Sequence, residues 1–185
     1  MITSKTEQAV CDAYIELMEE KRYDEIRAKD LIARAGIGRS TFYDHFDSPD
    51  AVLEMIERDL YETFPDGALA ISDTAAPESV RETSVRLACR HLQQNVKTYR
   101  ALCGPNGDYA FQALMEKRNQ QVMESLLART ETKRSNAEVQ VIIQAMAGMQ
   151  WYVLKCWALH ADEVSVTELA TMLYRIQGAI CAQLT

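Results

Sequence analysis

Apolar residues recur every three or four positions along most of the chain, which is the spacing of amphipathic helices. Such stripes predict helices over residues 7–21 and 50–64, and again along most of the chain beyond residue 78. Three Ser-x-x-Glu sequences, at Ser4, Ser135 and Ser165, have the form of a capping box that begins a helix. No segment shows the pattern of a strand, so the sequence predicts an all-α protein.

Residues 26–46 have the pattern of two short helices joined by a tight turn. Leu31 and Ile32 supply the apolar face of the first helix, and Gly36 lies where the chain must turn. Phe42 and Phe46 lie four residues apart, so both rings fall on one face of the second helix and anchor it to the core. The opposite face is polar. This layout is typical of a helix-turn-helix whose second helix enters the DNA major groove.

The charge of this segment differs from that of the whole chain. The formal net charge is −7, so the protein has no general attraction for nucleic acid. Residues 27–43 nevertheless carry four cations, Arg27, Lys29, Arg34 and Arg39, against the single acid Asp30. A confined basic patch can bind phosphates locally. The alternative is a solvated helical face in an ordinary bundle.

The stretch from Ala35 to Phe46, Ala-Gly-Ile-Gly-Arg-Ser-Thr-Phe-Tyr-Asp-His-Phe, resembles the DNA-binding signature of TetR/AcrR-family transcriptional regulators. The likeness extends over residues 4–60, and residues 78–185 resemble the family's helical regulatory domain more loosely. One departure is that Pro49 and Asp50 stand where members often carry a phosphate-contacting Lys. The resemblance implies a dimeric regulator that represses transcription and responds to a ligand.

We accordingly expect an N-terminal helix-turn-helix three-helix domain joined to a C-terminal helical bundle that serves regulation and dimerisation. The first domain is predicted at residues 1–64 and the second at residues 78–185. Residues 65–77, which are rich in small and polar side chains, form the predicted linker. A dimer would read a pseudo-palindromic operator with one recognition helix in each half-site. The residues predicted to contact DNA are Arg27, Lys29, Gly38, Arg39, Ser40, Thr41, Tyr43 and His45.

The helix predicted over residues 138–160 carries two apolar rows and therefore needs two partners. One partner is its own domain, and a second copy of the chain is the best source of the other. The helix over residues 165–184 can pair with it to give a four-helix interface. The predicted interface residues are Met149, Val153, Trp157, Leu169, Leu173, Ile176 and Ile180. The alternative is that helix 138–160 is the central core helix of a monomer.

Methionine and aromatic residues of the second domain suggest an apolar pocket for a small-molecule effector, with one or two polar anchors. The candidate lining residues are Tyr99, Met115, Arg118, Asn119, Met146 and Trp151. Such side chains at helical spacing more often form an ordinary core, so this alternative stays open.

Other chemistry has little support in the sequence. Five cysteines without a CxxC pair favour a reducing cytoplasm over a disulfide framework. The three histidines lie far apart, which predicts no metal site, and no pair of acid and base groups predicts catalysis. We expect no cofactor, no membrane span and a cytoplasmic location. A helical adaptor of the same fold that has lost DNA binding is the alternative function, and an enzyme is a weaker one.

Overall fold

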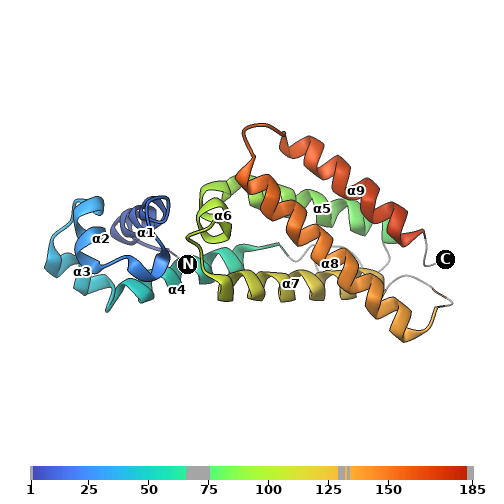
Figure 1. Cartoon of the computed structure of the whole chain (residues 1–185), viewed down its shortest axis with the longest axis horizontal. Coiled ribbons are helices and arrows are strands. Elements are labelled where there is room, and N and C mark those ends of the chain that lie inside the picture. Colours follow the sequence, from blue (N-terminus) through green and yellow to red (C-terminus); the bar gives the residue numbers. More distant parts are fainter. Residues whose placement is uncertain (1, 66–75, 129–131, 133, 183–185) are drawn as a thin grey trace. The chain divides into compact units, whose positions relative to one another are not determined.

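The computed structural model describes residues 2–65, 76–128, 132 and 134–182. The described residues are helical without a strand, which confirms the all-α prediction (Figure 1). The helices are α1 (Lys5–Leu17), the 3-10 turn η1 (Tyr23–Glu25), α2 (Ala28–Ala35), α3 (Arg39–His45), α4 (Pro49–Thr63), α5 (Pro77–Gln94), α6 (Val96–Cys103), α7 (Tyr109–Leu127), α8 (Asn136–Leu159) and α9 (Val166–Cys181).

The chain forms two compact units that differ from a simple division along the sequence. The first unit holds residues 1–63 and also residues 97–112, and the second holds residues 64–96 and 113–185. Most of α6 and the loop after it therefore cluster with the N-terminal helices. Most of the predicted linker, residues 66–75, lies outside the described residues.

Capping boxes begin α1, α8 and α9, as the Ser-x-x-Glu pattern predicts. At α1 the Glu7 amide donates to Ser4 Oγ and the Ser4 amide donates to the Glu7 carboxylate, both at 3.0 Å. The Thr3 amide, which donates to the same carboxylate at 2.8 Å, is the largest cause that lowers the pKa of Glu7 to about 2, and the Ser4 amide is the next. The same reciprocal bonds form at Ser135 and Ser165.

A left-handed glycine joins the two helices of the helix-turn-helix. Gly36 ends α2 with a φ of 66°, the one positive φ in the described backbone. The chain then enters α3, whose Phe42 is fully buried, and Phe46, the residue that directly follows α3, is nearly so. Their ring centroids lie 5.8 Å apart, which confirms the predicted aromatic anchor on one side of α3.

The loop between α6 and α7 is bonded to the N-terminal helices within the first unit. Asn106 Nδ2 donates to the Met18 carbonyl at 2.9 Å, and the Tyr23 amide donates to the Asn106 carbonyl at 3.0 Å. Gly107 allows the tight turn, because a Cβ there would collide with the carbonyl oxygen of Leu102. These long-range bonds attach residues 97–112 to the end of α1.

A carboxyl pair lies in the same unit. Glu57 of α4 is half-buried, and its Oε1 has no hydrogen-bond partner among the described residues. Burial is the main cause that raises the pKa of Glu57 to about 8, and the neighbouring Asp108 carboxylate adds to the rise. The neutral acid is therefore the favoured form of Glu57 in the fold at neutral pH.

The second unit is a bundle of α5, α7, α8 and α9. Within it α9 packs against both α5 and α8, and α8 also contacts α5. One apolar cluster joins α5, α7 and α8; it contains Val80, Val122, Met123, Leu126, Leu127, Ile143, Met146 and Ala147. This core uses the apolar stripes from which the helices were predicted.

We predict that Gly36→Ala lowers the free energy of unfolding of the first unit by about 1–2 kcal/mol, because a Cβ disfavours the left-handed region. No atom lies within 4 Å of a Cβ built there, so crowding does not contribute. Gly36→Asn is the matched control, since asparagine tolerates this conformation better. Urea unfolding followed by circular dichroism measures both variants. Equal losses for Ala and Asn would contradict the conformational explanation.

We predict that Glu57→Gln stabilises the protein increasingly as the pH rises from about 4.5 towards 8. The folded pKa of Glu57, about 8, lies above the ordinary glutamate pKa of 4.5. Its contribution to stability is thus complete below pH 4.5 and is lost as the pH rises through 8. Glutamine keeps the neutral state at every pH. Unfolding across this range, with the exposed Glu62→Gln as control, tests the prediction; parallel pH profiles for wild type and Glu57→Gln would contradict it.

Candidate functional site

The polar face of α3 is the strongest candidate for a nucleic-acid interface. Arg39, Ser40 and Tyr43 are exposed, while Phe42 and Phe46 hold the opposite face in the core. The Arg39 guanidinium carbon lies 5.7 Å from the centre of the Tyr43 ring, a cation–π distance. The helix therefore presents a cation, a hydroxyl and a phenol to its surroundings.

Two further cations lie at the start of α2. Arg27 and Lys29 are both exposed, and Arg27 donates to the Asp24 carbonyl at 3.3 Å. Asp30 directly follows Lys29 in the sequence, but Lys21 Nζ donates to its carboxylate at 2.6 Å. This bond is the main cause of the lowered pKa of Asp30. The acid is thus neutralised by a cation from outside the patch.

The fourth cation of the predicted patch is engaged elsewhere. Arg34 forms ion pairs with Glu16 at 3.4 Å and with Glu20 at 2.6 Å, which tie α2 to the C-terminal part of α1 and the turn after it. Arg34 therefore has a structural role. The basic set that remains for an anion is Arg27, Lys29 and Arg39.

The other predicted DNA contacts lie at the edges of α3. Thr41 is half-buried, and Gly38 precedes the helix with an ordinary φ of −75°. His45 is exposed, but its Nδ1 lies 3.8 Å from a Glu7 carboxylate oxygen. The structure thus brings Arg39, Ser40 and Tyr43 onto one face, whereas His45 is turned towards α1.

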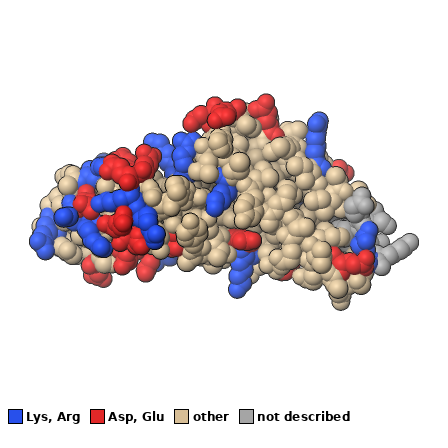
Figure 2. Space-filling view, viewed as in Figure 1, with Lys and Arg blue, Asp and Glu red and all other residues tan. Residues whose placement is uncertain are grey.

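Acidic side chains surround this face. Figure 2 shows Lys and Arg interspersed with Asp and Glu over the N-terminal elements. Asp44, Asp47 and Asp50, which follow the middle of α3, are all exposed. These acids would repel phosphates, whereas the three cations would attract them. The charges therefore restrict anion binding to the small area around the cations.

The residues predicted to line an effector pocket do not form one group. Tyr99 belongs to the first unit, and the other five belong to the second. Met115, Met146 and Trp151 are buried in the packing of their unit. The remaining two are polar anchors: Arg118 donates to the Phe64 carbonyl at 3.0 Å, and Asn119 donates to the Ala147 carbonyl at 2.6 Å.

The predicted interface residues are less exposed than a contact surface requires. Trp157, Leu169 and Leu173 are buried within their own unit, and Trp157 Nε1 donates to the Val164 carbonyl at 2.7 Å. The other four, Met149, Val153, Ile176 and Ile180, are half-buried. Three of the seven side chains are thus committed to the core of the same chain.

A third row of α8 is the exposed one, and sequence reasoning missed it. Tyr152 is 68% exposed and Val141 is 69% exposed. The row contains Val141, Ala145, Gly148, Tyr152, Cys156 and Leu159. Its regular three- and four-residue spacing is visible in the sequence, and no charged residue lies between Glu138 and Lys155. We call this row the outer face of α8.

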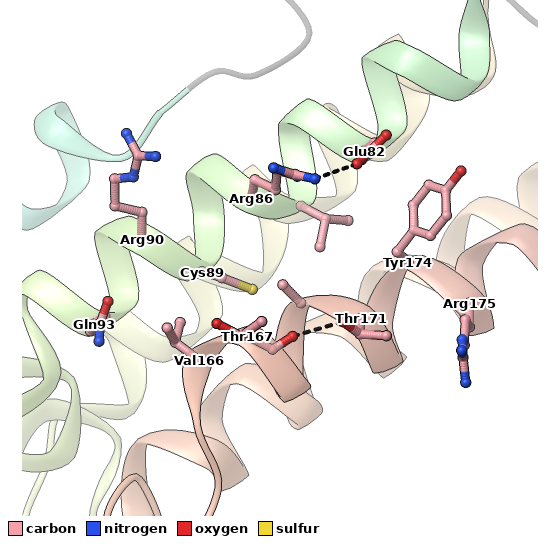
Figure 3. Close-up of a pocket in the computed structure, with 12 residues that line it drawn as sticks. Glu82, Arg86, Cys89, Arg90, Gln93, Val166, Thr167, Thr171, Tyr174 and Arg175 are labelled. Atoms are coloured by element: carbon pink, nitrogen blue, oxygen red, sulfur yellow. Dashed lines mark hydrogen bonds and ion pairs between the residues drawn. The ribbon is translucent and has the colours of Figure 1, made fainter.

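A surface groove of about 420 Å³ lies between α5 and α9 (Figure 3). Cys89 lies in it, and burial raises the pKa of this thiol to about 12, so it is unreactive at neutral pH. Arginines also line the groove, but Arg86 is paired with Glu82 at 2.6 Å and Arg175 extends away from α5. The cations do not converge on one point, so the groove is not a formed anion site.

Within the described ranges, no cluster of three or more His, Cys, Asp or Glu side chains is arranged to hold a metal ion. None of the described helices combines the length and the apolar character needed to cross a bilayer.

One known protein family matches the segment that contains the helix-turn-helix. Residues 11–56 match the sequence profile of the bacterial regulatory proteins of the tetR family. This range contains most of α1, all of α2 and α3 and the first half of α4. The comparison with curated proteins found no match.

Solved structures of regulators share the fold over nearly the whole chain. A TetR-like regulator from Rhodococcus sp. RHA1 is 15% identical with a TM-score of 0.71, covering 98% of both chains. A TetR regulator from Streptococcus agalactiae 2603V is 22% identical with a TM-score of 0.62, covering 94% of this chain and 93% of its own. The dihydroxyacetone kinase operon activator DhaS is 18% identical with a TM-score of 0.62, covering 97% and 96%. At these identities the likeness shows the fold.

Proposed function

Because the chain belongs to the TetR/AcrR family of transcriptional regulators, we propose that it is a ligand-responsive repressor that binds a pseudo-palindromic operator as a homodimer. The observation that carries the proposal is the polar face of α3. Arg39, Ser40 and Tyr43 are exposed on a short helix whose other side is anchored by buried aromatic rings. Such a helix can enter a major groove without disturbing its own core.

Each exposed cation has a separate role in this proposal. Arg39 lies on α3 and can donate two parallel hydrogen bonds to a guanine edge. Arg27 and Lys29, at the start of α2, bind the phosphates beside the groove and set the register of the domain. Tyr43 donates its hydroxyl to a phosphate. The exposed acids that follow the middle of α3 limit binding to correctly placed DNA.

The outer face of α8 supports the homodimer. Its members carry no charge and all except the half-buried Gly148 are exposed. Charged residues are normally depleted at the centre of an interface. Next to α8, α9 exposes Met172, and Ile176 is half-buried. A second copy covering both helices would remove these side chains from water and hold two α3 helices for two half-sites. The half-buried Met149 and Val153 would lie at its border.

The adaptor alternative rests on the exposed acids Asp44, Asp47 and Asp50. A gel shift with the DNA upstream of the protein's own gene separates the two functions: a discrete complex supports the regulator, and no complex with any DNA supports the adaptor. Deletion of the gene then tests the sign of regulation. Higher transcription of the target supports a repressor, whereas lower transcription would make the protein an activator.

We predict that Arg39→Ala weakens operator binding by about 1–3 kcal/mol per half-site, because a bidentate contact to a base is lost. Arg90→Ala, an exposed arginine of α5, is the matched control and should bind as wild type. Fluorescence anisotropy with operator and unrelated DNA distinguishes the roles. Equal loss on both DNAs would assign Arg39 to a phosphate, and no loss would remove it from the site.

We also predict a steep dependence of operator binding on salt. Arg27 and Lys29 provide two phosphate-binding cations in each subunit, so a dimer neutralises about four phosphates and the slope of log K against log salt is roughly −4. Lys29→Ala should reduce the magnitude of the slope for the dimer by about 2. Titrations at several salt concentrations measure both values. A slope near zero would contradict binding through this basic set.

We predict that Tyr152→Glu converts a dimer into a monomer that remains folded. The side chain is 68% exposed in the single chain, so a carboxylate there stays hydrated in the monomer but loses its water at an interface. Leu114→Glu places the same charge at an exposed apolar position of α7 and should remain dimeric. Sedimentation velocity measures the mass. A wild-type monomer at micromolar concentration would contradict the interface.

A further inference from the structure

Three buried amide side chains form a hydrogen-bonded chain across the second unit. Asn119 of α7, Gln150 of α8 and Gln177 of α9 are all at least 96% buried. Asn119 Nδ2 donates to the Ala147 carbonyl at 2.6 Å, and Gln150 Nε2 donates to Asn119 Oδ1 at 2.8 Å. Gln177 Nε2 in turn donates to Gln150 Oε1. Polar side chains are placed in a core at a cost unless their bonds are completed.

The direction of this amide chain is set at one end. The Ala147 carbonyl can only accept, so Asn119 must present its NH₂ group to it and its oxygen to Gln150. Gln150 therefore donates its NH₂ group to Asn119 and accepts from the NH₂ group of Gln177. The oxygen of Gln177 is then left at the far end of the amide chain. This oxygen, Gln177 Oε1, is buried and has no partner among the described residues. The amide chain therefore ends in an acceptor that requires a donor.

A small cavity adjoins this free acceptor. Ser84 of α5 also lines it, and Ser84 Oγ is likewise buried without a partner in the described part of the chain. The cavity volume is about 10 Å³, which is close to the space for one water. The other lining residues are Phe64, Pro65, Val85, Ala88, Val122, Met123, Leu126 and Gln150. Apart from Ser84, Gln150 and Gln177 the lining is apolar, and it contains no charged side chain.

We propose that this cavity is the effector site and that its ligand is a small neutral molecule with a hydroxyl group on an apolar body. The hydroxyl donates to Gln177 Oε1 and accepts from Ser84 Oγ, which completes both buried groups with a single atom. The effector role rests on the proposed function as a ligand-responsive regulator. The site itself rests on the polarised amide chain.

The lining excludes charged ligands. A carboxylate has no proton to give to Gln177 Oε1, and its charge would be buried without a cation beside it. An ammonium group could donate, but its charge would also be left without a counterion among the lining residues. A hydrocarbon would leave both polar atoms unpaired. A neutral hydroxyl can donate to Gln177 Oε1 and accept from Ser84 Oγ, and it brings no charge into the cavity.

A ligand larger than water must move part of the wall. Met123 has a flexible side chain that can repack. Phe64 is held from outside by Arg118, which donates to its carbonyl at 3.0 Å, and by the His91 ring at a centroid distance of 5.2 Å. Phe64 directly follows α4 in the chain. Ligand entry that displaces Phe64 thus acts on the residue next to α4, the last helix of the predicted N-terminal domain.

Three aromatic probes test the site on the full-length protein: phenol, its near-isostere toluene, and the charged benzoate. Phenol should raise the melting temperature, toluene should raise it clearly less, and benzoate should have no effect. Equal shifts for phenol and toluene would overturn the role of the hydrogen bonds. No shift with any probe would overturn the proposal, because the cavity would then hold a trapped water only.

Ser84→Ala identifies the contact without breaking the amide chain. The variant removes an unpartnered hydroxyl, so the protein should fold as wild type, and phenol affinity should fall roughly threefold to tenfold for one lost hydrogen bond. Ser125→Ala on the exposed face of α7 is the matched control and should bind phenol as wild type. Calorimetric titration measures the affinities. Unchanged affinity in Ser84→Ala would overturn the site.

Operator binding measured with and without phenol separates this proposal from the proposed function. The effector role is supported if phenol weakens operator binding by the wild type and weakens operator binding by Ser84→Ala less. Phenol bound through Ser84 without any effect on a formed operator complex would overturn the effector role. Absence of any operator complex without phenol would contradict the proposed function, whereas Ser84-dependent phenol affinity would still support the site.

Discussion

The burial of Phe42 and Phe46 on one side of α3 is the constraint on which the candidate interface depends. A seven-residue helix is too short to be stable alone, so packing must hold it in place. Gly36 makes this packing possible, because its left-handed backbone ends α2 and returns the chain towards the core. With one side fixed in this way, the polar residues Arg39, Ser40 and Tyr43 must face outwards. The same interactions that fold the domain thus create its binding face.

Local patterns in the sequence were sufficient for the helices and for the helix-turn-helix. The three capping boxes, the glycine turn and the Phe42–Phe46 pair depend on residues within four positions of one another, and each has the predicted form. Charges were predicted less completely. Arg34 counted as a free cation in the sequence, but Glu16 and Glu20 of α1 and the following turn neutralise it. Ion pairs between separate helices have no signature in a single sequence.

Long-range packing accounts for the other features of the structure that were not predicted from the sequence. The bond from Asn106 to Met18 at the end of α1 links residues 88 positions apart, and composition does not indicate such a contact. In α8 two apolar rows were assigned to separate partners. One row is wholly buried in its own unit, whereas the other is buried only at Met146 and Trp157, and a third row is exposed. The Asn119–Gln150–Gln177 chain was also hidden, because glutamines on apolar helices are indistinguishable in sequence from polar surface positions. Only Asn119 was anticipated as a polar anchor.

The proposed function as a dimeric regulator requires that two copies of α3 read bases at a fixed separation. Selection of bound sequences from a random DNA library tests this requirement most directly, because it presumes neither an operator nor an effector. We expect enrichment of an inverted repeat whose half-sites are separated by one helical turn, about 10 base pairs, or a multiple of it. Recovery of single half-sites would contradict the dimer. Recovery of no sequence preference, with the protein folded, would contradict base reading by α3.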